Sequence, residues 1–161
     1  MSPVEKAVLD GLNKGIQQEL MAYVFYKKGI EVSQDEQLVE ILEFLANEEK
    51  EHFRILEGQY DSLVRSEMWN TIADVLRKPG LPDIDERMAE IHEDFIDDVS
   101  ESTSPKEILK IGLRLEEDAV KLYSGLVDKT EDPKGKETFQ YLVKFEKGHA
   151  AKIRKILERF E

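Results

Sequence analysis

The sequence predicts an all-α protein in which two antiparallel helical hairpins, joined by a long and partly helical crossover, form a four-helix bundle. Three observations predict this fold. Helix-start signals recur at four places, apolar residues recur at alternating steps of three and four after each signal, and one long segment, 67–100, separates the second helix from the third. The length of 161 residues suits a single domain over 1–161, with a core that needs no disulfides.

Serine or aspartate, mostly followed by proline, marks the start of each predicted helix. Three of the four signals read as capping boxes, in which the serine accepts from a backbone N–H and the glutamate reaches back to the serine amide. These are Ser2-Pro3-Val4-Glu5, Ser33-Gln34-Asp35-Glu36 and Ser104-Pro105-Lys106-Glu107. The fourth, Asp132-Pro133, places proline at the first helical position. The predicted helices are about 3–31, 34–66, 105–129 and 133–160.

The 67–100 segment is predicted to cross over between the hairpins and to contain short helices. Pro79-Gly80-Leu81-Pro82 breaks it in two. The part from Met68 to Leu76 can continue helically, and the part after Asp83 carries a helical apolar stripe. This stripe must pack on the bundle or on a second subunit. We expect a homo-oligomer, a dimer.

The composition excludes several classes of function. The chain has no cysteine, which removes disulfides, thiolate metal sites and cysteine nucleophiles. Its net charge of −12, with no basic cluster, argues against binding nucleic acid or an anionic membrane. The apolar stretches are far shorter than the roughly 20 residues that cross a bilayer. The N-terminus lacks the features of a signal peptide, so we expect a cytoplasmic protein.

Each predicted helix has a seam, the stripe of apolar residues at alternating steps of three and four that faces the core. Two matching triplets of ionisable residues interrupt these seams. Glu19 precedes Glu49-x-x-His52 by 30 positions, Glu116 precedes Glu146-x-x-His149 by the same interval, and the triplets are 97 positions apart. At about 1.5 Å per residue, Glu19 lies about 18 Å before the end of its helix. Glu49 lies roughly 22 Å after the start of the next helix. The six groups should therefore meet in one layer of the bundle.

Such a layer predicts a bound metal pair. Four buried carboxylates are untenable as ions without counter-charge, and two divalent cations supply it while neutral imidazoles complete the ligand set. A single Glu-x-x-His is weak evidence, because a solvated helix face in an acidic protein produces it by chance. The conjunction of two such pairs with two seam glutamates favours the metal site. Carboxylates and imidazoles without thiolates suit iron or manganese and do not exclude zinc.

The sequence leaves the roles of several other polar residues open. Tyr23, Tyr26 and Tyr123 also lie in the seams. They are either buried core residues with satisfied hydroxyls, or donors to the ligand carboxylates, or participants in electron transfer. His92 is interpreted as a surface or packing residue rather than a ligand. The acids expected to face solvent are Glu48, Glu51, Glu117 and Asp118.

The motifs on all four helices resemble the ferritin-like di-iron carboxylate superfamily, and most closely its rubrerythrin-like branch. The matching stretches are Glu19-Leu-Met-Ala-Tyr-Val-Phe-Tyr26, Glu49-Lys-Glu-His52, Glu116-Glu-Asp-Ala-Val-Lys-Leu-Tyr123 and Glu146-Lys-Gly-His149. The resemblance implies two iron ions per chain, with manganese or zinc as substitutes. It implies that Glu19 with His52 binds one iron and Glu116 with His149 the other. Glu49 and Glu146 would bridge the two.

By the same resemblance, the chain is expected to be an oxidoreductase that reduces hydrogen peroxide or dioxygen. Two departures narrow this expectation. Full-length rubrerythrins carry a cysteine-ligated rubredoxin module, whereas this chain has no cysteine and needs an external electron donor. They also carry an additional glutamate where this chain has Ala119. Ferroxidase activity feeding iron storage or transport, with a multi-subunit shell, remains an alternative, and so does a non-catalytic metal-binding bundle.

Overall fold

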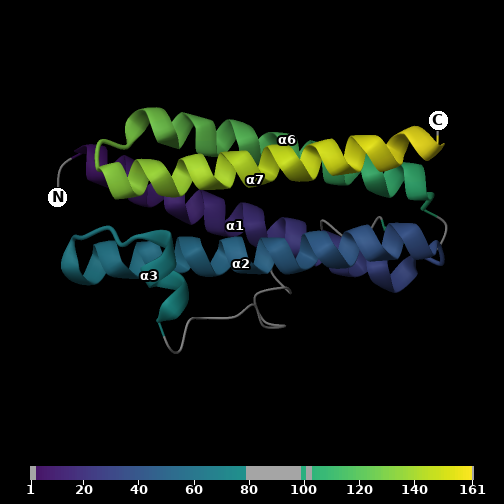
Figure 1. Ribbon diagram of the computed structural model, residues 1–161, viewed down its shortest axis with the longest axis horizontal. Coiled ribbons are helices and arrows are strands. Elements are labelled where there is room, and N and C mark those ends of the chain that lie inside the picture. The colour runs from purple at the N-terminus through teal and green to yellow at the C-terminus, as the bar shows by residue number, and fades with distance from the viewer. Residues whose placement is uncertain (1–2, 79–98, 101–102, 161) are drawn as a thin grey trace.

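The computed structural model describes residues 3–78, 99–100 and 103–160, and this part of the chain is all-α (Figure 1). The elements are α1 (Pro3–Val32), α2 (Glu36–Ser66), α3 (Ile72–Arg77), α6 (Pro105–Lys129), α7 (Pro133–Leu157) and a terminal 3₁₀ turn, η1 (Glu158–Phe160). The four long helices are confirmed to within a few residues. The last one ends at Leu157, earlier than predicted, because the chain tightens into η1.

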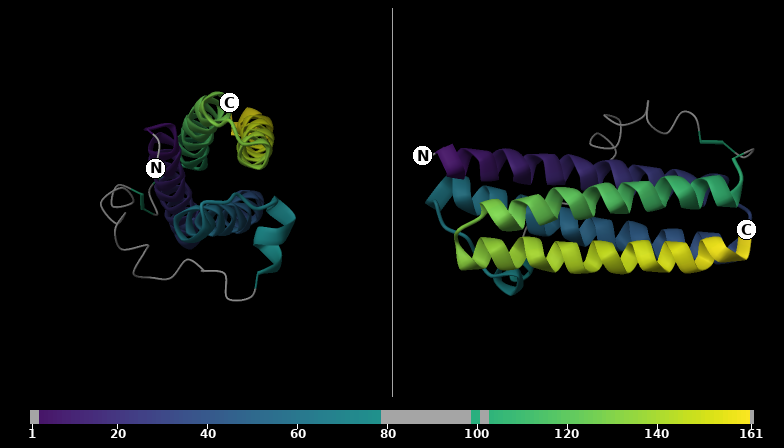
Figure 2. Two further views of the ribbon diagram at one scale, coloured as in Figure 1. Left: turned by 90° about the vertical axis from the view of Figure 1, so that its left-hand side faces the viewer. Right: turned by 90° about the horizontal axis from the view of Figure 1, so that it is seen from above.

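The helices form the predicted pair of antiparallel hairpins. Helix α1 packs on α2 and α6 packs on α7, while α1 also lies beside α6. The end-on view in Figure 2 shows the four helices around one common core. Helix α2 ends and α6 begins at opposite ends of the bundle, so α2 and α6 run parallel (Figure 1). The connection between them therefore has to cover the length of the bundle, which short hairpin loops cannot do.

The helix starts follow the sequence signals with one correction. Ser104 and Glu107 form the predicted capping box, and Asp132 caps α7 by accepting from the N–H of Lys134 at 2.8 Å. The capping box predicted at Ser33 is wrong. Asp35 caps α2 instead, and its Oδ1 accepts from the N–H of Leu38 at 3.0 Å. Its carboxylate also carries a negative charge that the helix dipole favours at this end. The box predicted at Ser2 lies outside the described residues.

Replacing Asp35 with alanine is expected to lower the free energy of unfolding, because α2 loses its N-cap acceptor. Asp35→Asn keeps a capping oxygen and removes the charge that pairs with Arg159. It should therefore retain most of the stability. Urea denaturation of the two variants and of Ser33→Ala measures these effects. A larger loss in Ser33→Ala than in Asp35→Ala would restore the original assignment of the cap.

The first part of the crossover folds back against α2. Helix α2 ends at Glu67, whose left-handed backbone (φ 57°) turns the chain. The buried Trp69 then packs edge-on against Phe139 of α7, with ring centroids 5.8 Å apart. The short helix α3 follows, capped by Thr71, so the helical character predicted between Met68 and Leu76 is confirmed in part. The second half of the crossover, including His92 and the apolar stripe after Asp83, lies outside the described residues.

The core consists of two apolar clusters at different heights in the bundle. One includes Phe25, Leu42 and Ile153, and the other includes Leu12 and Phe139. The predicted ionisable layer falls between them along every long helix. Apolar packing on both sides thus keeps water from this layer. Among the described helices, none is long and apolar enough to cross a membrane.

Candidate metal centre

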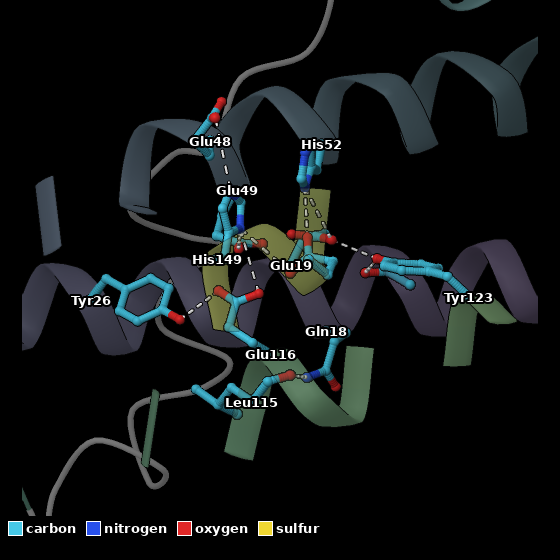
Figure 3. Close-up of polar contacts among 12 residues, drawn as sticks. Gln18, Glu19, Tyr26, Glu48, Glu49, His52, Leu115, Glu116, Tyr123 and His149 are labelled. Carbon is cyan, nitrogen blue, oxygen red and sulfur yellow. Dashed lines mark hydrogen bonds and ion pairs between the residues drawn. The ribbon is translucent and has the colours of Figure 1, made fainter. Parts of the chain in front are cut away.

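The six ionisable residues of the two triplets converge inside the bundle. Figure 3 shows the side chains of Glu19, Glu49, His52, Glu116 and His149 gathered there. Each is almost fully buried, with an exposed fraction of at most 2%. Helices α1 and α6 contribute one glutamate each, and α2 and α7 contribute one Glu-x-x-His pair each. The residues are Glu19, Glu49, His52, Glu116, Glu146 and His149. Periodicity explains the convergence, since steps of three and four keep Glu and His on the core-facing side of their helix.

These residues form two groups that share two glutamates. Glu19 and His52 belong to one group, and Glu116 and His149 belong to the other. Glu49 and Glu146 belong to both. Within each group the ligand atoms lie within 4.8 Å of one another, close enough to surround a single metal ion.

The two histidines lie between the carboxylates of different helices. Nδ1 of His52 lies 2.7 Å from Oε1 of Glu146, across the bundle. Nδ1 of His149 lies 3.5 Å from Oε1 of Glu49 and 3.5 Å from Oε2 of Glu116. The two imidazole rings stack on each other, with centroids 5.6 Å apart and planes inclined by 18°. Both Nδ1 atoms therefore face the shared set of carboxylate oxygens.

Every one of the six residues has a buried polar atom with no hydrogen-bond partner in the described part of the chain. These atoms are Oε2 of Glu19, Oε1 of Glu49, Nε2 of His52, Oε2 of Glu116, Oε2 of Glu146, and both ring nitrogens of His149. Each such atom costs about 1–3 kcal/mol when it is left unpaired. This many unpaired atoms in one layer fits a ligand set, because a bound cation satisfies lone pairs that the protein itself leaves free.

The pKa values of these buried groups are shifted by their burial and by one another. Burial raises the pKa values of Glu19 and Glu146 well above the usual range, and repulsion adds to it, from Glu146 at Glu19 and from Glu116 at Glu146. Burial also acts on Glu116, but its contacts with Glu146 and His149 outweigh it and lower its pKa. Burial lowers the pKa of His52. The pKa of His149 rises to about 10, because contacts with Glu116 and Glu146 outweigh its burial.

Two tyrosines hold the lone glutamates in a crossed arrangement. Tyr123 of α6 donates to Oε1 of Glu19 on α1 at 2.6 Å, and Tyr26 of α1 donates to Oε1 of Glu116 on α6 at 2.6 Å (Figure 3). Both tyrosines are fully buried. Tyr23 is only partly buried, and no hydrogen bond joins it to another described residue. The three seam tyrosines therefore separate into two carboxylate donors and one packing residue.

Glycine makes room for each donating tyrosine. A Cβ atom at Gly15 would lie 2.9 Å from Cε1 of Tyr123, and one at Gly112 would lie 3.2 Å from Cε1 of Tyr26. The two glycines are 97 positions apart, like the two tyrosines and the two lone glutamates. The repeat thus extends beyond the ligand candidates to the residues that orient them.

Tyr123→Phe is expected to weaken binding of a divalent cation 10- to 100-fold, the usual effect of removing a partner that orients a ligand. The ring still fills the core, so the helical content should not change. Tyr23→Phe is the matched control, because it removes a tyrosine hydroxyl from the seam of α1 that does not contact a carboxylate. Calorimetric titration with cobalt(II) measures the affinities. Equal affinities in Tyr123→Phe and Tyr23→Phe would contradict the assignment.

Of the four acids predicted to face solvent, two are exposed and two are partly buried. Glu117 and Asp118 are exposed, and Glu51 is partly buried. The side chain of Glu48 is only 21% exposed, and its Oε1 lies 3.7 Å from Nε2 of His149. Sequence reasoning missed this contact, because Glu48 lies on the flank of the α2 seam. Only the approach of α7 brings the histidine to it.

Comparisons with known proteins agree with this architecture. No curated protein matches the chain. A DUF305 fragment from Deinococcus radiodurans has a similar structure, with a TM-score of 0.67, 16% identity, and coverage of 98% of this chain and 97% of that one. A hypothetical protein from Pyrococcus furiosus has a TM-score of 0.67 and 22% identity, covering 100% and 99%. At these identities, both show the fold alone.

The family comparison shows more than the fold, because a family model matches most of the chain. The ferritin-like domain matches residues 7–159, which include most of α1, all of α2, α6 and α7, and all six buried ionisable residues. The fold and the buried cluster of carboxylates and histidines agree with this match. The chain therefore belongs to the ferritin-like domain family.

Proposed function

We propose that the chain is a di-iron carboxylate oxidoreductase that reduces hydrogen peroxide or dioxygen. The observation that carries the proposal is the set of unpaired carboxylate oxygens and imidazole nitrogens in one buried layer. The two groups of ligand atoms share Glu49 and Glu146, so two ions would lie side by side. Two ions of charge +2 balance four ionised glutamates.

The ligand set favours iron or manganese over magnesium or calcium, which prefer all-oxygen ligands. Glu19 and His52 would hold one ion, Glu116 and His149 the other, and Glu49 and Glu146 would bridge them. When bound, two ferrous ions supply the two electrons that reduce hydrogen peroxide, with two protons, to two waters. Because the chain has no cysteine, the electrons that restore the ferrous state come from an external donor.

The protein's own residues orient and protect the pair. The hydroxyls of Tyr26 and Tyr123 fix one oxygen of Glu116 and of Glu19, which leaves the other oxygen of each free for a metal. The two apolar clusters exclude water above and below the layer. A low-polarity surrounding strengthens the attraction between the carboxylates and the cations. The four carboxylates therefore carry a negative charge that the six side chains do not balance without cations.

Single-turnover reactions test this function. Protein loaded anaerobically with two ferrous ions per chain should consume one equivalent of hydrogen peroxide, and an added reductant should allow further turnover. Glu117→Ala, which removes an exposed acid, should react like the wild type. Iron uptake far beyond two per chain would instead indicate ferroxidase and storage activity. Peroxide consumption no faster than that of free ferrous iron would refute a catalytic role.

A further inference from the structure

The two halves of the centre differ in chemistry at a pair of positions whose side chains contact the histidines. The 97-residue repeat relates His52 to His149, and it relates Glu48 to Phe145, since each lies one position before the glutamate of its Glu-x-x-His. The candidate ligands themselves are identical in the two halves. One half therefore has a carboxylate where the other half has an aromatic ring.

The outer nitrogen of His149 faces this carboxylate. Its Nδ1 points toward the oxygens of Glu49 and Glu116, and its Nε2 is buried without a hydrogen-bond partner. Oε1 of Glu48 lies 3.7 Å from that Nε2, beyond hydrogen-bond length but within ion-pair distance. The side chain of Glu48 is 21% exposed, so it can rotate closer to the ring. An imidazole that binds a metal through Nδ1 carries its proton on Nε2, which then needs an acceptor.

The outer nitrogen of His52 has a different environment. Its Nε2 is also buried without a partner in the described part of the chain. The rings of Tyr141 and Phe145 lie edge-on to the imidazole, with centroids 6.2 Å and 6.0 Å away. Among the described residues, the carboxylates that pair with His52 do so through Nδ1. Aromatic packing thus takes the place of the acceptor in this half.

We propose that Glu48 is a positioning residue for His149, which makes the two metal positions unequal. Its carboxylate accepts the Nε2–H, keeps Nδ1 turned toward the metal and raises the basicity of the ring. Such partners typically change metal affinity 10- to 100-fold. The position formed by Glu116 and His149 is therefore the tighter one and fills first. This inference rests on the proposed function, because it requires a metal pair.

Calorimetric titration of the metal-free protein with cobalt(II) tests the inequality. The wild type should bind two ions in two steps, and Glu48→Gln should raise the Kd of the tighter step 10- to 100-fold while leaving the weaker step nearly unchanged. Glu51→Gln is the matched control, since it removes the same charge from a partly buried position one turn along the same helix. An equal loss in Glu51→Gln would mean that net charge, not positioning, sets the affinity.

Two variants that each lack one histidine ligand identify which metal position depends on Glu48. In a His52→Ala protein, Glu48→Gln should still weaken the remaining ion 10- to 100-fold, whereas in a His149→Ala protein it should have no effect. Circular dichroism verifies that all variants are folded. Equal losses in both backgrounds, or no loss in either, would overturn the inference while the wild type still binds two ions. A wild type that binds no pair would instead refute the proposed function, and this inference with it.

Discussion

Glu146→Ala is expected to abolish binding of the metal pair. The Oε1 of Glu146 lies 2.7 Å from Nδ1 of His52, and its Oε2 lies 3.7 Å from Nδ1 of His149, so the residue serves both groups. Its loss removes a shared ligand and leaves three carboxylates against four positive charges. Metal analysis after dialysis should find at most one ion per chain, with affinity reduced at least about 100-fold, the upper end of the effects of outer partners.

Glu49→Ala should have the same consequence, because Glu49 also belongs to both groups. Glu117→Ala is the control for the loss of one negative charge, since Glu117 lies next to Glu116 but is exposed. Retention of both ions in either Glu49→Ala or Glu146→Ala would show that the bridging assignment is wrong.

The second large effect concerns stability, and its sign reverses with metal. In the metal-free protein, Glu19→Gln is expected to raise the free energy of unfolding at pH 8 by about 1–3 kcal/mol, because it removes a buried charge that burial and Glu146 disfavour. In the metal-loaded protein the same substitution removes a ligand and should lower stability. Thermal unfolding with and without chelator measures both. If Glu19→Gln changed the stability of the metal-free and the metal-loaded protein in the same direction, the argument from charge would be wrong.

The pH dependence of the metal-free protein follows from the same groups. Since the folded-state pKa values of Glu19 and Glu146 are raised, the folded chain binds more protons than the unfolded chain. The stability that they contribute is fully present below the unfolded pKa of about 4.3 and is lost as the pH rises through the folded pKa. His149 acts in the same direction up to its folded pKa of about 10. Glu116, whose pKa is lowered, acts in the opposite direction.

The expected result is a metal-free protein that loses stability between about pH 5 and pH 8. Bound metal should flatten this dependence, because cations replace protons as the counter-charge. Urea denaturation across this range, with and without chelator, checks both parts. Metal-free stability that increases with pH in this range would mean that His52, whose pKa burial lowers, outweighs Glu19 and Glu146.

The positions of the six ionisable groups could be predicted from the sequence because helical periodicity fixes them. Glu49 and His52 are one turn apart in an apolar seam, and the helix starts set their height relative to Glu19. Both facts are local to one hairpin. The same spacings recur 97 positions later in the second hairpin. The layer of ionisable residues could therefore be predicted without knowing any contact between side chains.

Contacts between hairpins could not be predicted in this way. The crossed pairing of Tyr123 with Glu19 depends on how α1 and α6 rotate against each other, which Gly15 permits by leaving room for the ring. The contact of Glu48 with His149 depends on the approach of α7 to α2. The prediction of Ser33 as the cap failed for a local reason, because two good capping residues, Ser33 and Asp35, lie two positions apart.

Iron analysis combined with spectroscopy tests the central claim most directly. Protein purified without chelator and reconstituted with ferrous iron should contain two irons per chain. After oxidation it should show the visible absorption and the magnetic coupling of a ferric pair. A single iron per chain, uncoupled ferric ions, or a tightly held redox-silent metal that iron cannot replace would contradict the account.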